Sequence, residues 1–291
     1  MTWEETIIEI RKNSAFSELV EKAYLDEDVL LNIERFRKSE EFNETLKQIR
    51  KIIPDFSNKK VLDLGAGNGI ATLAFALEGM NVCAVEPYPS ETVGYKAIQK
   101  AEDYYKTGRI HISCNYGESL PHDTETFDIV YVRQAMHHAF DLKEFVKEAA
   151  RVLKKKGLLV TVRDHVIYNE ADKKWFLDSH PLHRFYGGEN AFTYKQYHDA
   201  ITGAGLVVKL FYRHYDNIIN YFPEPREVID KRIAERDQLA LSIIKNKLPS
   251  FFSNFSLLKK ILKKRLEKKI GPANDERKIP GRHISFFAIK D

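Results

Sequence analysis

The chain has 291 residues, of which 43% are hydrophobic and 30% are charged. This balance is typical of a folded globular protein, and it excludes a collagen, a coiled-coil rod and a wholly disordered chain. No stretch approaches about 18 consecutive apolar residues, and the first ten residues lack the basic and then apolar layout of a signal peptide. We therefore expect a cytoplasmic protein.

The distribution of charge and the two cysteines exclude further classes of partner and of metal site. Residues 241–270 contain nine Lys and Arg and one Glu, a net charge of +8, whereas the whole chain carries +4 and the remainder therefore −4. A basic charge confined to one segment argues against a nucleic acid as partner. Cys83 and Cys114 both lie in apolar segments, so the sequence predicts neither a disulfide framework nor a Cys-rich zinc site.

In chain order, the sequence begins with helices and continues with alternating strands and helices. Apolar residues recur at helical spacing over 3–52, so residues 1–57 are predicted to form an N-terminal helical segment. Short apolar runs rich in β-branched residues then predict strands over 61–64, 82–86, 109–113, 127–132 and 158–163. Between them, helices are expected over 68–79, 91–106 and 141–154. Such alternation predicts a parallel sheet covered on both faces.

The second half of the chain completes the sheet around an insertion. An irregular stretch is expected over 165–192, followed by a helix over 193–204 and strands over 207–214 and 284–290. Residues 217–280 interrupt this pattern with helical and polar segments. We therefore predict an α/β core over 58–216, an insertion over 217–280 and a last core strand within 281–291. The expected fold is a doubly wound, seven-stranded, mostly parallel sheet.

A glycine-rich turn follows the first predicted strand. Asp63–Gly69 reads Asp-Leu-Gly-Ala-Gly-Asn-Gly, and Glu86 ends the next strand 17 residues after Gly69. Glycines permit positive φ and let a ligand approach the backbone, while the helix that follows offers free N–H groups. An acid at this distance suits the two hydroxyls of a ribose. The acid before the first glycine would repel a pyrophosphate, which disfavours a nicotinamide cofactor. It suits a cofactor with an ammonium and a sulfonium.

With these motifs the sequence resembles the class I S-adenosylmethionine-dependent methyltransferases, in particular the small-molecule group that includes the quinone-biosynthesis enzymes. The matching segments lie in the expected order, at 63–69, 86–87, 118–121 with 127–130, and 151–159. The resemblance implies a Rossmann-like fold and S-adenosylmethionine as cofactor. It also implies that Asp63, Gly65 and Gly67 line the methionine part, Glu86 the ribose and Glu118 the adenine.

One departure affects the adenine site, because Tyr116 stands where the family usually has an Asp. Either Tyr116 stacks on the base or Glu118 makes the polar contact. The full set predicted to bind the cofactor is Asp63, Gly65, Ala66, Gly67, Glu86, Pro87, Tyr116, Gly117, Glu118 and Arg133.

The acceptor is expected at the carboxyl ends of the strands, where ligands of open α/β sheets bind. Methyl transfer requires alignment and, for some acceptors, a base, and histidine has a suitable pKa. The candidate bases are His137, His138 and His165. A structural role is the competing interpretation for each of them. The predicted substrate-binding residues are Arg35, Arg163, Asp164, His183, Arg184, Tyr186 and Glu189.

His180 and His183 lack carboxylates at a convincing ligand spacing, so no metal site is predicted. The resemblance implies that the N-terminal helices form a lid over the cofactor, with Arg35, Phe36 and Ser39 facing inward. A solvated amphipathic helix is the competing interpretation. Residues 251–270 form a predicted cationic amphipathic helix, for which packing on the domain is favoured over contact with a membrane surface.

Two functions follow from these patterns. The first is O- or N-methylation of a small-molecule, glycan or secondary-metabolite intermediate. The alternative is a non-catalytic binding module that keeps the cofactor fold and acts as a scaffold at a membrane or partner surface. The intact cofactor motifs favour the enzyme.

Overall fold

The computed structural model of the protein describes residues 1–55, 57–247, 260–261, 265 and 275–291. Over these residues the chain divides into two units, Met1–Asn220 with Pro280–Asp291, and Tyr221–Ile279. The first unit contains the sheet and every residue of the site discussed below. The bounds of the second unit lie within four residues of those predicted for the insertion.

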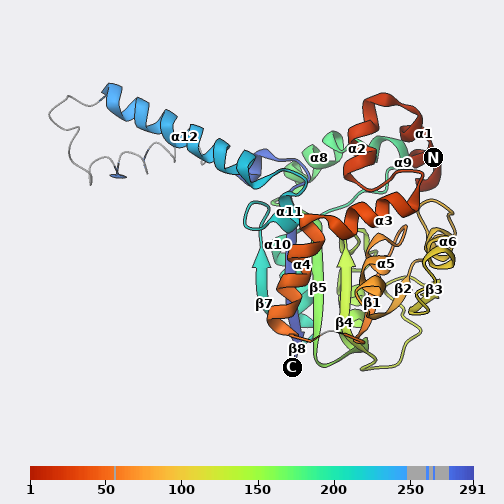
Figure 1. The fold of residues 1–291 in the computed structure, drawn as a ribbon. Coiled ribbons are helices and arrows are strands. Elements are labelled where there is room, and N and C mark those ends of the chain that lie inside the picture. Colours follow the sequence, from red (N-terminus) through yellow and green to blue (C-terminus); the bar gives the residue numbers. More distant parts are fainter. Residues whose placement is uncertain (56, 248–259, 262–264, 266–274) are drawn as a thin grey trace. The chain divides into compact units, whose positions relative to one another are not determined.

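A mostly parallel sheet forms the centre of the first unit (Figure 1). Within the described residues, seven strands follow the order β3-β2-β1-β4-β5-β8-β7. Strand β8 is antiparallel to both of its neighbours, whereas the other pairs along this path are parallel. The predicted fold class is therefore confirmed. The strands are β1 (Lys60–Leu64), β2 (Asn81–Val85), β3 (Ile110–Ser113), β4 (Phe127–Arg133), β5 (Leu153–Ile167), β7 (Leu206–Tyr212) and β8 (His283–Lys290).

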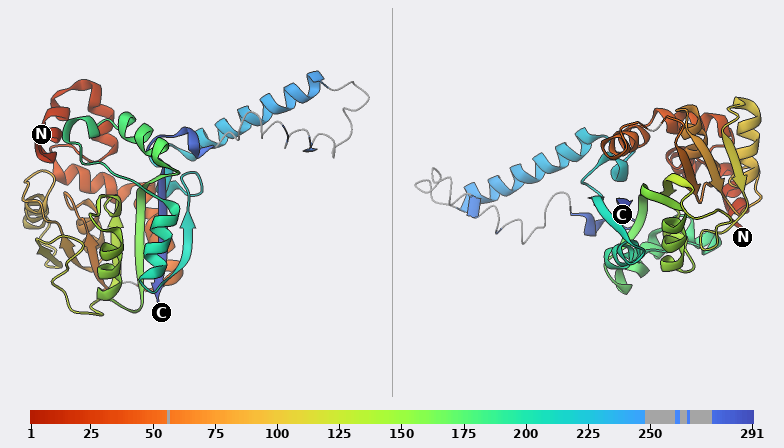
Figure 2. Two further views of the ribbon diagram at one scale, coloured as in Figure 1. Left: turned by 180° about the vertical axis from the view of Figure 1, so that it is seen from behind. Right: turned by 90° about the horizontal axis from the view of Figure 1, so that it is seen from below.

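Helices cover both faces of this sheet. The connecting helices are α5 (Ile70–Leu77), α6 (Tyr95–Tyr105), α7 (Leu142–Val152) and α10 (Tyr194–Gly203). Helix α5 lies on the face that is in front in Figure 1, and α7 and α10 cover the opposite face, seen from behind in Figure 2. Residues 70–76 of α5 are all buried, because this helix is apolar on every side and lies between the sheet and α3.

The N-terminal helices are α1 (Trp3–Lys12), α2 (Ser17–Lys22), α3 (Val29–Lys38) and α4 (Glu40–Ile52), with a 3-10 turn at Ser14–Phe16. A chain of ring contacts joins α3 and α4 to the sheet. Phe36 contacts Phe42 with ring centroids 5.1 Å apart, Phe42 contacts Phe75 at 5.3 Å, and Phe75 contacts Tyr131 at 4.9 Å. The two helices therefore form part of the core.

The segment expected to be irregular over 165–192 is partly regular, so that prediction was wrong. It contains α8 (Glu170–Ser179), α9 (His183–Tyr186) and the short strand β6 (Phe192–Thr193), which pairs with β5. Asn169 caps α8 by accepting from the backbone N–H of Asp172. Within α8 only Phe176 is buried, so the segment has too narrow an apolar face to show helical periodicity in the sequence.

The remaining elements are α11 (Ile218–Tyr221), α12 (Arg226–Lys247) and two 3-10 turns at Met136–His138 and Glu276–Lys278. Within the second unit, Arg232 forms an ion pair with Glu224 at 3.0 Å. Residues 251–270, apart from 260, 261 and 265, lie outside the described residues, so the two interpretations of the basic segment both stand. Across the part of the chain that the structure describes, no helix combines the length and the apolar character needed to cross a membrane.

Candidate active site

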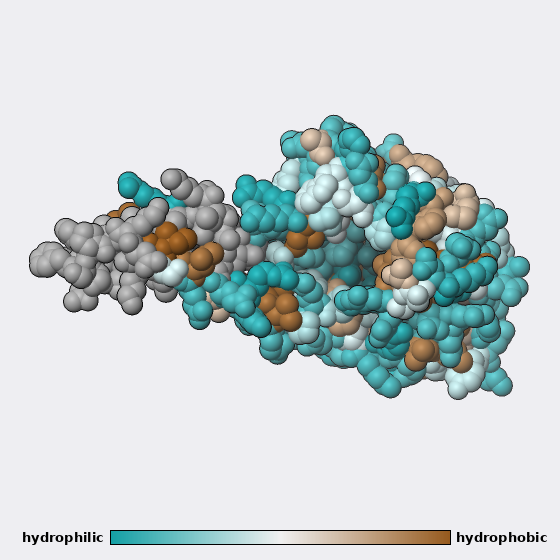
Figure 3. Space-filling model, turned by 90° about the horizontal axis from the view of Figure 1, so that it is seen from above, coloured by the Kyte–Doolittle hydropathy of each residue, from teal (hydrophilic) through white to brown (hydrophobic). Residues whose placement is uncertain are grey.

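The predicted site residues gather at the carboxyl ends of the parallel strands. There, β1 lies between β2 and β4, so the strand order reverses on the two sides of β1. Ligands of open α/β sheets bind at such a reversal. Figure 3, which looks down on this end of the molecule from above Figure 1, shows a hollow with mostly hydrophilic side chains around it.

The glycine turn after β1 adopts the backbone that its sequence predicts. Gly65, Gly67 and Gly69 have φ values of +77°, +55° and +83°, a region that L side chains rarely adopt. A Cβ at position 65 would lie 2.5 Å from Cβ of Ala135, so the close approach of the next loop also requires glycine. A Cβ at Gly67 would meet nothing within 4 Å, which leaves the backbone there open to a ligand.

Two buried carboxylates flank this turn. Glu86 accepts from the backbone N–H of Gly67 through Oε2 at 2.8 Å and from that of Tyr88 through Oε1 at 3.0 Å. Asp63 accepts from the hydroxyl of Thr72 at 2.6 Å. Burial raises the pKa of Glu86 to about 7 and that of Asp63 to about 6. Each carboxylate oxygen has two lone pairs, so both acids retain capacity to accept from a bound ligand.

The predicted adenine residues form a partly exposed surface after β3. Glu118 accepts from the backbone N–H of Phe140 at 2.8 Å. Tyr116 is 60% and Phe140 88% exposed, and their ring centroids lie 6.1 Å apart. A Cβ at Gly117 would lie 2.2 Å from the ring of Phe145, so glycine is required beneath this surface. Two exposed aromatic rings beside a carboxylate can bind a flat, hydrogen-bonding base.

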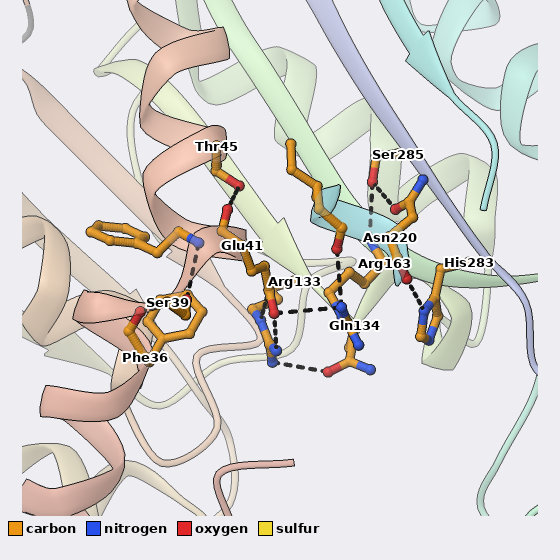
Figure 4. A network of polar contacts seen from close by, with 12 residues as sticks. Phe36, Ser39, Glu41, Thr45, Arg133, Gln134, Arg163, Asn220, His283 and Ser285 are labelled. Carbon is orange, nitrogen blue, oxygen red and sulfur yellow. Dashed lines mark hydrogen bonds and ion pairs between the residues drawn. The ribbon is translucent and has the colours of Figure 1, made fainter. Parts of the chain in front are cut away.

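Arg133, a predicted cofactor residue at the end of β4, is paired with a residue that the sequence did not suggest. Its guanidinium donates to Glu41 of α4 through Nε at 2.6 Å and Nη2 at 3.1 Å (Figure 4). Arg163 reaches the same carboxylate, with Nη1 3.6 Å from Oε2. Burial alone would raise the pKa of Glu41, but the two arginines hold it below its ordinary value. Arg133 and Arg163 therefore hold α4 against β4 and β5.

The three predicted catalytic histidines lie in one cluster. His137 is buried, and its Nδ1 lies 3.0 Å from Oδ1 of Asp164, which also accepts from the backbone N–H of His137 at 3.1 Å. The ring centroid of His137 is 4.1 Å from that of His138 and 4.7 Å from that of His165. Burial lowers the pKa of both His137 and His165 well below the ordinary value, so both rings are neutral at pH 7.

Of the predicted substrate residues, Asp164 and Glu189 join this cluster. Asp164 is fully buried, and burial raises its pKa to about 8. Its contacts are those of a group that orients His137. Glu189 lies with Oε2 3.8 Å from Nε2 of His137 and 4.0 Å from Nε2 of His138.

The other predicted substrate residues contact the protein itself. Arg35 donates to the backbone carbonyl of Glu21 at 2.8 Å. Arg184 lies over the rings of Phe16 and Phe185, at 5.6 and 5.1 Å. The backbone N–H of His183 donates to Nδ1 of His180. Tyr186 packs against Trp3 and donates its hydroxyl to Glu189.

Sequence reasoning missed Glu41 and His283. Glu41 lies on the buried face of α4 with Phe42, Thr45 and Ile49, and a single acid among these residues at helical spacing was the available signal. His283 starts β8 and faces His165, with ring centroids 4.9 Å apart. No local pattern could indicate this contact, because 118 positions separate the two histidines.

The fold and the two acids beside the glycine turn match the arrangement that the sequence predicts for a nucleoside-cofactor site of the methyltransferase type. Comparison with known families agrees, because residues 62–161 match the family model described as "Methyltransferase domain". This part of the chain is therefore a methyltransferase domain, and the predicted resemblance is confirmed.

Similar proteins carry the same domain. "Uncharacterized methyltransferase YcgJ" of Bacillus subtilis is 32% identical over 143 residues, which cover 46% of this chain and 52% of that protein. The mitochondrial ubiquinone biosynthesis O-methyltransferase of Bos taurus is 31% identical over 104 residues, which cover 35% of this chain and 28% of that protein. The chain thus spans about half the length, or less, of these curated relatives.

Solved structures share the fold at low sequence identity. Geranyl diphosphate C-methyltransferase from Streptomyces coelicolor, solved with Mg²⁺, geranyl diphosphate and S-adenosyl-L-homocysteine, superposes with a TM-score of 0.55 and 12% identity. The alignment covers 86% of this chain and 79% of that one. At this level of identity the similarity establishes the fold.

Proposed function

We propose that the protein is an S-adenosylmethionine-dependent methyltransferase that acts on a small molecule. The observation that carries this proposal is the pair of buried acids, Asp63 and Glu86, on either side of an open glycine turn. Glycines with positive φ and an acid at the end of β2 also occur in other nucleoside sites. The acid before the turn distinguishes this one, since it favours a cationic ligand over a pyrophosphate.

The residues present fit this cofactor. Glu86 has lone pairs left after its two backbone contacts and is proposed to accept from both ribose hydroxyls. Asp63 and the backbone of Gly65–Gly67 line the amino-acid end. Tyr116, Gly117 and Glu118 form the surface for the adenine, next to Phe140. When bound, S-adenosylmethionine supplies a methyl group on an electrophilic sulfonium, so the protein must mainly align the acceptor.

The acceptor is proposed to bind at the histidine cluster, because the turn after β4 and the end of β5 bring His137, His138 and His165 to the same edge as the glycine turn. Of the three rings, His138 alone reaches solvent, with 39% of its side chain exposed, whereas His137 and His165 are buried. Polar groups predominate at this edge, which suits a hydroxylated or amine-bearing acceptor and hence O- or N-methylation. Glycan and secondary-metabolite intermediates are both hydroxylated or amine-bearing acceptors of this kind.

A bound-ligand mass spectrum of the purified protein tests the cofactor directly, and turnover with hydroxyl and amine acceptors tests the reaction. We expect retained S-adenosylmethionine or its demethylated product, and methylation of one acceptor class. Cofactor binding without turnover on any acceptor would favour the non-catalytic scaffold.

Substitution of the histidines one at a time by alanine tests the acceptor site. Replacing the group that serves as base should lower single-turnover rates by about 10²-fold or more while cofactor affinity is kept. Calorimetry with S-adenosylhomocysteine checks that each variant still folds and binds. Rates unaffected by all three substitutions would show that no histidine base takes part.

A further inference from the structure

Three side chains in the histidine cluster converge as metal ligands do. One ligand atom from each of His137, His165 and Glu189 lies within 4.8 Å of the other two. They come from three segments, since His137 follows β4, His165 lies in β5, and Glu189 precedes β6. The side chains of His137 and Glu189 are 2% and 6% exposed, so water reaches little of this cluster.

The hydrogen bonds fix which ring nitrogens face the centre. Nδ1 of His165 lies 3.1 Å from the backbone carbonyl of Gly281, and Nδ1 of His138 lies 3.1 Å from that of Gly188. A carbonyl can only accept, so both Nδ1 atoms carry the proton. Nδ1 of His137 lies 3.0 Å from Oδ1 of Asp164, and its Nε2 is the ring nitrogen that faces Glu189. A neutral ring protonated on Nδ1 has a lone pair on Nε2.

Glu189 adds another set of lone pairs to the same space. Its Oε2 is buried, and within the described residues no hydrogen-bond donor contacts it. The nearest ring nitrogens are Nε2 of His137 at 3.8 Å and Nε2 of His138 at 4.0 Å. Lone pairs that face each other across a buried gap repel unless a cation or a proton lies between them.

Each of the three converging side chains is oriented by a further hydrogen bond. Asp164 lies within hydrogen-bond distance of Nδ1 of His137, the carbonyl of Gly281 accepts from His165, and Tyr186 donates its hydroxyl to Glu189. Carboxylates, backbone carbonyls and other polar groups in this position are the usual second layer of metal sites, where they fix the ring tautomer. The cluster therefore contains both the side chains that could contact a metal ion and the groups that orient those side chains.

We propose that His137, His165 and Glu189 bind a divalent transition-metal ion of the Zn²⁺ or Fe²⁺ class. Two neutral imidazoles and one carboxylate are the protein ligands of catalytic zinc and of non-haem iron, whereas Mg²⁺ prefers oxygen ligands alone. The sequence predicted no metal site and considered His180 with His183. The proposed set differs from that pair.

The distances require a small adjustment on binding. Ligand atoms about 2.1 Å from one ion lie at most about 4.2 Å apart. The separation of 3.8 Å between His137 and Glu189 satisfies this limit, and a separation at the 4.8 Å bound would have to shorten by about half an ångström. Three protein ligands leave coordination positions open. Binding of the acceptor at these open positions depends on the proposed function. Binding of the ion is independent of it.

Metal titration of the full chain, stripped with a chelator and without cofactor or acceptor, tests the proposal. We expect calorimetry to give one equivalent of Zn²⁺ bound, a visible absorption band with Co²⁺ that reports nitrogen and oxygen ligands, and no uptake of Mg²⁺. Glu189→Gln should weaken Zn²⁺ binding by about 100-fold or more. His165→Gln provides a second variant, and thermal unfolding identifies any variant that fails to fold.

His198→Gln is the matched control, because His198 lies on α10 outside the cluster and its substitution should leave binding unchanged. No Zn²⁺ uptake by the wild type would overturn the proposal, as would uptake that both cluster variants retain. In that case a proton shared between Glu189 and the ring nitrogens would explain why these groups face each other without a cation. Because the titration uses no S-adenosylmethionine, either result leaves the proposed methyl transfer to be judged on its own experiment.

Discussion

Glu86 allows the cofactor site to be tested by both mutation and pH. Its two oxygens each accept one backbone N–H, at 2.8 and 3.0 Å, and the proposed ribose contacts would add one charge-assisted hydrogen bond to each. Glu86→Ala removes both acceptors. Since such bonds contribute about 1 to 2 kcal/mol each, cofactor affinity should fall by roughly 2 to 4 kcal/mol, or roughly 30- to 1,000-fold.

The pH dependence follows from the raised pKa of the same group. Burial, backbone contacts and the nearby Asp63 leave the pKa of Glu86 at about 7 in the free protein. The ribose requires the ionised form, so binding must release the proton that Glu86 holds at low pH. At pH 6, one unit below this pKa, the cost is about 1.4 kcal/mol, and affinity should rise about tenfold between pH 6 and pH 8.

Isothermal titration calorimetry with S-adenosylhomocysteine measures both effects. Glu86→Ala should bind weakly, with little change between pH 6.5 and pH 8, because the pKa of Asp63 is about 6. Glu91→Ala, an exposed acid five residues further on, is the matched control and should bind like the wild type. Unchanged affinity in a folded Glu86→Ala variant, or a flat pH profile in the wild type, would refute the assignment.

Two further predictions concern stability. Glu41→Ala leaves Arg133 and Arg163 buried without their shared carboxylate, so urea unfolding should show a loss of about 3 to 5 kcal/mol, and a loss below about 1 kcal/mol would contradict the role of this pair. Asn68→Ala removes a 2.8 Å hydrogen bond from the glycine turn to the backbone carbonyl of Tyr24, both buried, and should lower the free energy of unfolding by about 1 to 3 kcal/mol. Wild-type stability of this variant in the same assay would show that the bond does not anchor the N-terminal segment.

The parts of the fold that the sequence predicted are those with local signals. Residues 61–64 of β1 are buried at every position and all but Asp63 are apolar, as expected for an interior strand of a parallel sheet. The glycines after it have the positive φ values that their spacing indicates. Local chemistry alone determines both features, so one sequence is enough to find them.

Features that depend on distant partners could not be predicted. Strand β5 was predicted over 158–163 but begins at Leu153, which pairs with Phe127 of β4. The three lysines at 154–156 interrupt the apolar pattern, so the sequence did not indicate this part of the strand. Glu41 was missed because its role depends on Arg133, 92 positions away. Glu189 was predicted to bind substrate, and only the folded chain reveals that it faces two histidines from another segment.

A crystal structure of the protein with S-adenosylhomocysteine tests the central claim most directly. The account predicts that both ribose hydroxyls donate to Glu86, that the amino-acid end lies against Gly65–Gly67 beside Asp63, and that the sulfur points towards the histidine cluster. A ligand bound away from the glycine turn, or with its ribose out of reach of Glu86, would contradict it.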